Sequence, residues 1–248
     1  MNTSYNRVVT TYNNGITEVV DYSNSIEVGF TREKKEVIKS YGRVKLGRIK
    51  GKKKGFNEKN VYINALRAKK KIRQLCNNNV DLLTKFITLT FAIDITETDI
   101  KLANSLFSKF IKRLEYSVNQ KVEYLCVPEL TQKGIIHYHM LCNIPYVDIK
   151  EIQKIWSHGI VYINKIEDIN NVAGYISNYI DKDFGKTFCG VRHFFKSKGV
   201  VYPTSQKIDS SYDYNLYNDD NLVYVNIHEN TYCGNVKIRV YNKNEKWS

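Results

Sequence analysis

The sequence predicts an α+β protein with a central antiparallel sheet and flanking helices, and three observations lead to this fold class. Residues 86–91 form a continuous run of β-branched and aromatic residues that is typical of a central strand. Residues 96–114 have the apolar spacing of a helix. Residues 122–130 and 135–143 read as two strands joined by Thr131-Gln132-Lys133-Gly134, which indicates a hairpin and hence antiparallel pairing.

The amino-terminal residues 1–60 are expected to form a β appendage followed by a basic arm. Val8 to Tyr12 and Ile16 to Val20 alternate around Asn13-Asn14-Gly15, which favours a hairpin. Residues 42–55 are basic and interrupted by glycine, so they are expected to be a loop or an arm that orders on DNA. A helical pattern follows from about residue 60 to residue 75.

Residues 61–203 are expected to be the main domain. Thr96 to Asp99 supply N-cap chemistry for a helix in which Leu102, Leu106, Phe110 and Leu114 line one face. After the hairpin, Pro145 ends the strand unit, and the pattern predicts a helix at 149–156, a strand at 160–163 and a helix at 169–181. Residues 204–248 are expected to be a β extension with strands at 222–227 and 236–241.

Length and composition bound the class of protein. A chain of 248 residues with 42% hydrophobic content can bury one large core. It has no stretch of roughly 18 apolar residues, and its first seven residues lack the apolar centre of a signal peptide, so we expect a cytoplasmic protein without membrane contact. The five cysteines form no Cys-x-x-Cys pair and are expected to be reduced thiols, mostly buried.

The net charge of +13 favours a polyanionic partner. Basic residues gather between Lys34 and Arg73, and clustered lysine and arginine bind phosphates by releasing counterions. A solvated charged face is the alternative interpretation. The candidates for DNA contact are Arg48, Lys52, Lys53, Lys54, Arg67, Lys69, Lys70, Lys71 and Arg192, with His193 as a further candidate for phosphate contact.

A pair of histidines in the second hairpin strand has the spacing of a metal site. Side chains at i and i+2 of a strand face the same way, so His137 and His139 present two imidazoles together while Tyr138 points to the other face. With a three-residue loop at 132–134, Glu129 would lie directly across from His137. Two imidazoles and a carboxylate with open positions suit Mg²⁺ or Mn²⁺. Two unrelated surface histidines are the alternative.

Tyrosines on the last predicted helix of the main domain offer a nucleophile. Tyr175, Tyr179 and Lys182 are spaced i, i+4 and i+7, which places them on one helical face. The same stripe also occurs in ordinary helix packing. A phenol with a usual pKa of about 10 attacks poorly unless a nearby metal or lysine favours the phenolate.

Together these residues resemble the three ordered motifs of HUH-type rolling-circle replication initiators. The motifs are Phe86-Ile87-Thr88-Leu89-Thr90-Phe91, then Glu129 with His137-Tyr138-His139, then Tyr175-x-x-x-Tyr179-x-x-Lys182. The resemblance covers roughly Arg67 to Pro203. Trp156 to Gly159 and Arg192 to Pro203 are similar to segments in the plasmid and phage initiators of low-GC Gram-positive bacteria.

The resemblance implies a metal-dependent endonuclease that nicks one strand of single-stranded or supercoiled origin DNA. Tyr179 would attack, leaving a 5′-phosphotyrosine and a free 3′-hydroxyl that primes synthesis, with Tyr175 as second nucleophile or packing residue and Lys182 as supporting cation. The chain has no Gly-x-x-x-x-Gly-Lys-Ser/Thr motif, so a host helicase and a host polymerase are the implied partners.

Two other functions remain open from the sequence. A relaxase or a single-strand transposase uses the same chemistry, although the tyrosines here follow the histidines, which favours the initiator. A non-catalytic origin-binding or copy-control protein is the alternative from another class, and it would bind DNA without nicking it.

Overall fold

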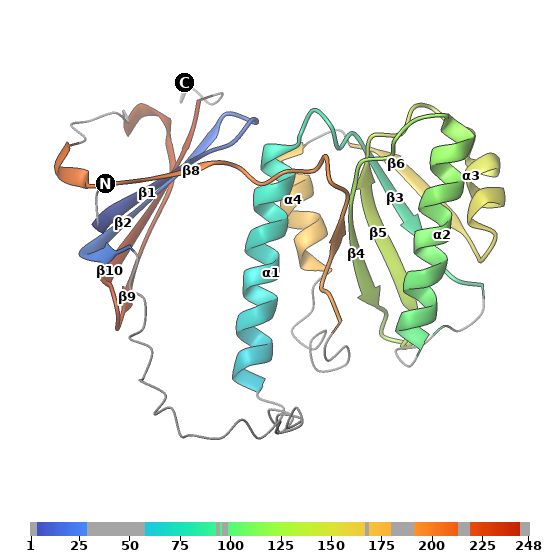
Figure 1. The fold of residues 1–248 in the computed structure, drawn as a ribbon, viewed down its shortest axis with the longest axis horizontal. Coiled ribbons are helices and arrows are strands. Elements are labelled where there is room, and N and C mark those ends of the chain that lie inside the picture. Colours follow the sequence, from blue (N-terminus) through green and yellow to red (C-terminus); the bar gives the residue numbers. More distant parts are fainter. Residues whose placement is uncertain are drawn as a thin grey trace, which may run out of the picture. The chain divides into compact units, whose positions relative to one another are not determined.

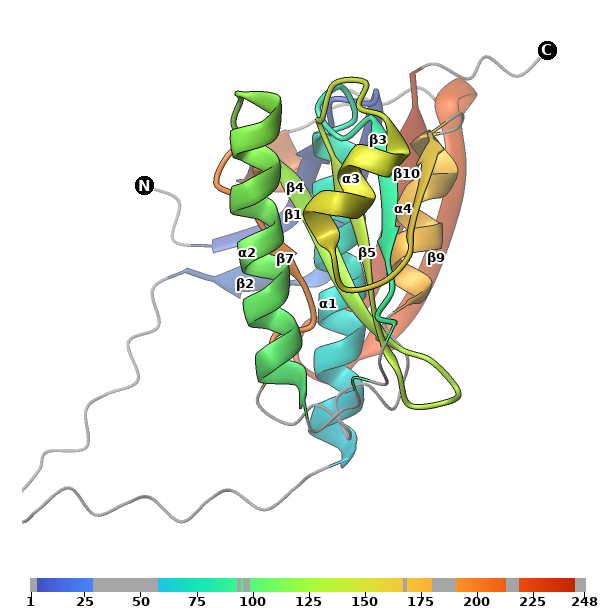
Figure 2. The same ribbon diagram turned by 90° about the vertical axis from the view of Figure 1, so that its right-hand side faces the viewer.

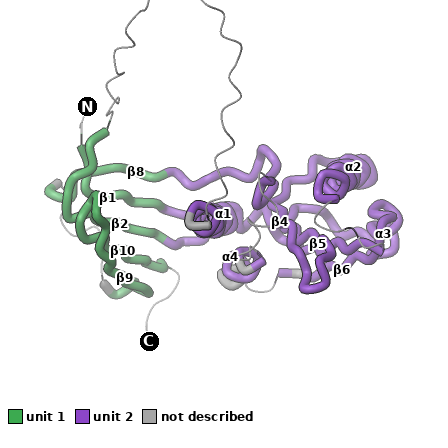
Figure 3. The backbone as a smooth tube through the Cα atoms, turned by 90° about the horizontal axis from the view of Figure 1, so that it is seen from below, with its two compact units in different colours: residues 1–10, 17–57, 205–248 green, residues 11–16, 58–204 purple. Residues whose placement is uncertain are grey.

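A computed structural model describes residues 4–28, 58–92, 95, 99–166, 169–179, 191–212 and 219–243. The chain divides into two compact units (Figure 3), one of residues 1–10, 17–57 and 205–248 and the other of residues 11–16 and 58–204. Both contain an antiparallel sheet, and the second also contains the helices. The predicted α+β class is therefore confirmed. The basic segment 42–55 lies outside the described residues.

The second unit is a three-layer arrangement around a five-stranded antiparallel sheet of order β6-β3-β5-β4-β7 (Figure 1). Helices α1 and α4 cover one face, and α2 and α3 cover the other (Figure 2). The strands are β3 (Lys85–Leu89), β4 (Tyr124–Leu130), β5 (Ile136–Cys142), β6 (Val161–Lys165) and β7 (Phe195–Lys196). The helices are α1 (Glu58–Asn78), α2 (Ile100–Val118), α3 (Ile149–Trp156) and α4 (Ile169–Asn178).

The alternation of side chains along β5 assigns residues to the two faces of this sheet. Tyr138 and Met140 are fully buried against α2 and α3. Leu141 packs in the other cluster, with residues of α1 and α4. Because successive side chains of a strand point to opposite faces, His137 and His139 share the face of Leu141. The predicted opposition of Tyr138 to the two histidines is confirmed.

Helix α2 buries one apolar stripe, but the stripe differs in part from the predicted one. Phe107, Phe110 and Leu114 are buried, whereas Leu102 is 52% exposed, so its assignment to the buried face was wrong. A helix turns by about 100° per residue, which carries Leu102 away from its buried neighbour Ala103. Residues 96–98 of the expected N-cap lie outside the described residues, and Asp99 makes no side-chain capping bond.

The hairpin between β4 and β5 has the three-residue loop that the sequence predicts. The Thr131 N–H donates to the Ile135 carbonyl at 2.9 Å and closes the loop. Gly134 has φ +77°, a left-handed conformation that glycine adopts without steric cost. This loop pairs Leu130 with Ile136 and therefore Glu129 with His137.

The first unit is a second antiparallel sheet, of order β8-β1-β2-β10-β9. Its strands are β1 (Ser4–Thr11), β2 (Ile16–Glu27), β8 (Ser205–Ile208), β9 (Leu222–Asn230) and β10 (Gly234–Asn242), and short 3-10 turns lie at Ser210–Tyr212 and Asp219–Asn221. Strands from both ends of the chain meet here, with Arg7 opposite Ile208. Asp21 of β2 forms ion pairs with both Arg7 and Arg239, which ties three strands together.

Cysteine and membrane expectations concern the described part of the chain alone. Cys76, Cys126 and Cys142 are buried free thiols and Cys233 is half-buried, as expected, while Cys189 lies outside the described residues. Among the described helices, none combines the length and the apolar character that a membrane span requires.

The core beneath α2 gives a prediction for stability. Phe110→Ala removes a fully buried ring and should lower the free energy of unfolding by about 3 to 5 kcal/mol. Chemical denaturation followed by circular dichroism measures this. Tyr116→Ala, on the same helix at a position that is 90% exposed, should change it by less than about 0.5 kcal/mol. Equal losses for the two variants would contradict the assigned core face.

Candidate metal centre

Two imidazoles lie together on the α4 face of the sheet. His137 and His139 project from β5 with ring centroids 6.4 Å apart. His139 is buried and His137 is half-buried. Between them Tyr138 points to the opposite face, where its hydroxyl donates to Asn104 Oδ1 of α2 at 2.6 Å. The strand is thereby anchored in the core on one side while it offers both histidines on the other.

Glu129 completes a group of three possible ligands. It lies on β4 directly across from His137, and its Oε2 is 2.7 Å from Nε2 of His139. The ligand atoms of Glu129, His137 and His139 all lie within 4.8 Å of one another. The structure therefore brings together the three residues that the sequence proposed as metal ligands.

The chemistry of this group fits a divalent cation. Thr88 Oγ1 of β3 lies 3.2 Å from Nδ1 of His139, and Thr88 pairs with His139 across the two strands. When Nδ1 carries the proton and donates it to Thr88, Nε2 presents a lone pair to the Glu129 carboxylate. Two acceptors 2.7 Å apart require a proton or a cation between them. Two imidazoles and a carboxylate leave further coordination positions open for water or phosphate oxygen.

Burial also prepares His137 to act as a neutral ligand. Desolvation lowers the pKa of His137 below its usual value, and the neighbouring His139 lowers it further, while the negative charge of Glu129 partly opposes both effects. A lowered pKa keeps the imidazole unprotonated over more of the pH range. Unprotonated imidazole is the form that binds metal.

Tyr179 lies directly against this group. Its ring stacks on that of His139 with centroids 3.6 Å apart and an interplanar angle of 9°. Tyr175, which is 54% exposed, meets Tyr179 edge to face at 5.1 Å and also contacts Phe86 of β3. Both tyrosines therefore share one side of the α4 segment, as their spacing predicts. Lys182, the third residue of the predicted stripe, lies outside the described residues.

Packing of α4 holds the tyrosines over the sheet. Ala173 and Ile176 are buried in the cluster that contains Phe86 and Leu141. On the other side of the helix, Arg73 of α1 donates through Nε to Ser177 Oγ at 3.4 Å. The position of Tyr179 is thus set by helix packing as well as by its contact with His139.

The environment of Tyr179 disfavours its phenolate. Burial raises the pKa of Tyr179 well above the usual value, and a hydrogen bond with Tyr175 and the negative charges of Tyr175 and Glu129 raise it further. The tyrosine is therefore protonated at rest. A cation beside its oxygen is needed to favour the ionised form.

The predicted DNA-contacting residues divide into three groups. Arg48, Lys52, Lys53 and Lys54 lie outside the described residues. Lys69 and Lys70 lie on α1, outside the lining of the cavities that the structure describes. Arg67, Lys71 and Arg192 are brought together around one cavity.

Sequence reasoning did not identify Thr88 or the aromatic residues near Arg192 as parts of a site. Thr88 lies within the predicted strand 86–91 at the same parity as Phe86, which gives its face but not its neighbour. Its place beside His139 depends on the β3–β5 pairing, and this pairing joins segments about 50 residues apart.

The fold and the site define an α+β protein with a Glu/His/His metal-type group and a tyrosine-bearing helix laid against it. Residues 84–184 match the family model of the replication-associated protein ORF2. The matched region includes Glu129, both histidines and the tyrosine helix, and it supports a role in replication initiation. No match was found among curated proteins or among solved structures.

Metal affinity should depend on pH. Mn²⁺ binding measured by calorimetry should weaken by about tenfold between about pH 7.5 and pH 5.5, because protons compete for the imidazole nitrogens. Since burial lowers the pKa of His137, the loss should begin below the usual histidine value of about 6.5. In His139→Ala the binding should disappear at every pH. Wild-type affinity that stays constant on acidification would argue against imidazole ligands.

Thr88 gives a second prediction for the same group. Thr88→Val keeps the shape of the side chain but removes the oxygen that accepts from Nδ1 of His139, so Mn²⁺ affinity should fall by roughly 10- to 100-fold. Thr90→Val on the same segment is the matched control, because Thr90 Oγ1 bonds to the Ile160 backbone instead of the histidine. Equal affinities for the two variants would remove Thr88 from the site.

Proposed function

We propose that this protein initiates replication as a metal-dependent endonuclease of the HUH type, which nicks one strand of origin DNA through Tyr179. The observation that carries the proposal is the stacking of Tyr179 on His139 at 3.6 Å, with His139 itself 2.7 Å from Glu129. A nucleophile candidate and a metal-type group are thereby in direct contact. The match of residues 84–184 to a replication-associated family supports the same process.

The proposed reaction is a transesterification. The Tyr179 oxygen attacks the scissile phosphorus, a bond between that oxygen and phosphorus forms, and the bond from phosphorus to the 3′ oxygen breaks. The phenolic proton is lost and the leaving 3′ oxygen gains one, so the products are a 5′-phosphotyrosine and a free 3′-hydroxyl. One phosphodiester replaces another, and no nucleotide is consumed.

The residues of the site divide the work of this step. Glu129, His137 and His139 would hold Mg²⁺ or Mn²⁺, which when bound would polarise the scissile phosphate and offset negative charge. Stacking on His139 restricts the Tyr179 ring to one orientation, which favours attack along one line. Lys182 is proposed as a further cation that favours the Tyr179 phenolate.

Tyr175 is proposed as the partner of Tyr179. Its hydrogen bond raises the pKa of Tyr179, so it influences the nucleophile directly, and its own ring is 54% exposed. An exposed phenol next to the first nucleophile is also placed for a second attack that would end a replication round. The substrate is single-stranded or supercoiled origin DNA, with strand separation by a host helicase and synthesis by a host polymerase, and the process is rolling-circle replication.

Trapping of a covalent protein–DNA adduct tests the function. Wild-type protein with labelled origin DNA and Mn²⁺ should give an adduct on a denaturing gel, and EDTA should prevent it. Tyr179→Phe keeps the ring stacked on His139 but lacks the attacking oxygen, so adduct formation should fall by roughly a thousandfold or more. Tyr162→Phe, an exposed tyrosine on β6, should react like wild type.

Other outcomes of this assay reassign or reject the proposal. Adduct that survives Tyr179→Phe and is lost in Tyr175→Phe would make Tyr175 the nucleophile. Wild-type protein that binds origin DNA but forms no adduct with any divalent metal would identify a non-catalytic origin-binding protein instead.

A further inference from the structure

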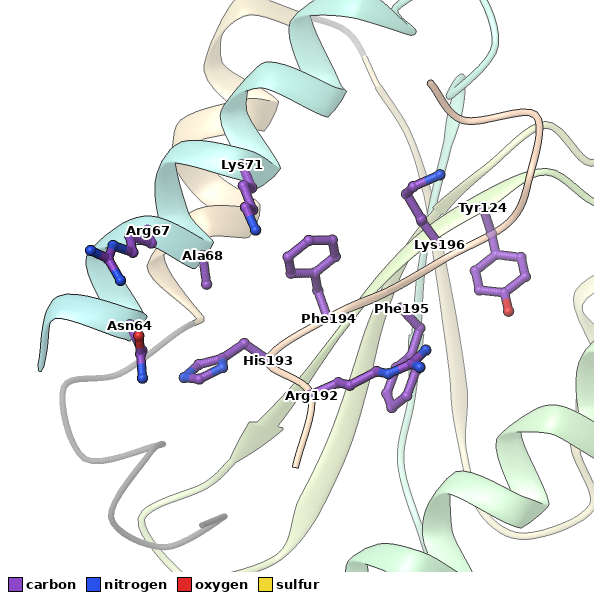
Figure 4. Close-up of a pocket in the computed structure, with 10 residues that line it drawn as sticks. All are labelled: Asn64, Arg67, Ala68, Lys71, Tyr124, Arg192, His193, Phe194, Phe195 and Lys196. Carbon is purple, nitrogen blue, oxygen red and sulfur yellow. The ribbon is translucent and has the colours of Figure 1, made fainter. Parts of the chain in front are cut away.

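A cavity of about 630 Å³ lies between α1 and the segment 192–196 at the β7 edge of the sheet (Figure 4). Lys71 and Ala68 project from the side of α1 that faces this segment, and the ring of Phe194 lies between them and the strand. Tyr124 of β4 also contributes to the lining. The volume falls within the range of about 300 to 1,000 Å³ that is typical of small-ligand sites.

The lining is strongly cationic. Arg67, Lys71, Arg192 and Lys196 all contribute to it, and the described lining contains no carboxylate. Lys196 is held in place by the Ser197 and Val200 carbonyls, which orient its ammonium group without neutralising its charge. A concave site with this excess of positive charge favours an anion, and phosphate is the anion that arginine and lysine bind best together.

Aromatic faces accompany these cations. Phe194, Phe195 and Tyr124 are all only half-buried, so part of each ring is accessible around the cavity. Phenylalanine offers no hydrogen bond, so these rings select flat apolar surface. Cations that bind phosphate beside rings that stack a base form the combination by which proteins hold unpaired nucleotides without sequence choice.

The cavity and the metal-type group share structural elements. Strand β4 carries Tyr124 at one end and Glu129 near the other, a separation along the strand of about 17 Å. Segment 192–196 pairs with β4 through Lys196 opposite Leu125 and Phe195 opposite Cys126. A strand of DNA a few nucleotides long could therefore reach from the metal-type group to the cavity along the β4 edge.

We propose that this cavity is a nucleotide subsite for the DNA strand, in which an unpaired base lies against the aromatic rings while Arg67, Lys71 and Arg192 bind the flanking phosphates. The substrate class rests on the proposed function, and the subsite adds where the strand is held and why it must be single-stranded. A base in a duplex is stacked and paired, so only an unpaired base can enter.

The test is equilibrium binding of a fluorescein-labelled single-stranded oligonucleotide, followed by anisotropy in EDTA on a Tyr179→Phe background. The variant Arg67→Gln/Lys71→Gln/Arg192→Gln should lower affinity by about tenfold or more and reduce the salt slope by roughly 2, since each single-strand phosphate contact contributes about 0.7. All three side chains are exposed, so the fold should persist, and matching circular dichroism spectra and unfolding midpoints check this.

A charge-matched variant provides the control. Lys101→Gln/Lys109→Gln/Lys112→Gln removes the same charge from exposed positions of α2, on the opposite face of the sheet. It should lower affinity by less than about threefold, because long-range attraction alone is largely screened at physiological salt. Equal losses for the two triple variants would overturn the subsite.

Two further arms test the ligand. Photocross-linking with 5-iododeoxyuridine in the oligonucleotide should modify Tyr124 or the segment 192–196, and cross-links confined to other segments would contradict the proposal. A free mononucleotide such as dTMP should displace the oligonucleotide only weakly. Displacement at low mononucleotide concentration would instead make the cavity a site for free nucleotides.

Failure of the subsite is distinguishable from failure of the nicking proposal, because binding is measured without metal and without the nucleophile. Adduct formation by wild type with equal binding by both triple variants would reject the subsite alone. Absence of any adduct, with a selective loss of binding in the Arg67/Lys71/Arg192 variant, would reject nicking and retain a single-strand binding site.

Discussion

The register between β4 and β5 is the constraint on which the candidate site depends. A three-residue loop with Gly134 in the left-handed conformation pairs Glu129 with His137, and this pairing brings the carboxylate within 2.7 Å of His139. Because side chains alternate along a strand, a shift of one residue would send one of these groups into the opposite core. Buried clusters on both faces of the sheet resist such a shift, so the packing that stabilises the fold also holds the three possible ligands together.

The site concentrates groups that are unfavourable together without a cation. Glu129 lies beside two imidazoles in a partly buried position, and the adjoining Tyr179 has a raised pKa because of burial and negative neighbours. A divalent cation would satisfy the carboxylate and imidazole acceptors and would favour the phenolate at the same time. The same contacts that disfavour the ionised tyrosine without metal therefore make its reactivity dependent on metal.

The charges of the second unit are divided between two places. The metal-type group contains the carboxylate of Glu129, whereas the described lining of the cavity between α1 and segment 192–196 carries four cations and no carboxylate. A cation needs an anionic ligand, and a phosphate backbone needs positive charge, so the two places suit different parts of one DNA substrate. Strand β4 contributes to both, which relates the holding of a strand to the proposed cutting of it.

The sequence by itself determined the α+β class, the hairpin loop and the faces of His137, Tyr138 and His139, because these follow from short-range periodicity and turn chemistry. It misplaced Leu102 on the buried face of α2, since a helical stripe about one residue wide is not resolved by spacing alone. Only the tertiary structure decided that Thr88 lies beside His139, that Tyr179 stacks on the same ring, and that α1 and the segment 192–196 enclose a cavity. Each of these contacts joins segments far apart in the chain, and their meeting is fixed by strand order and helix packing, which no local pattern encodes.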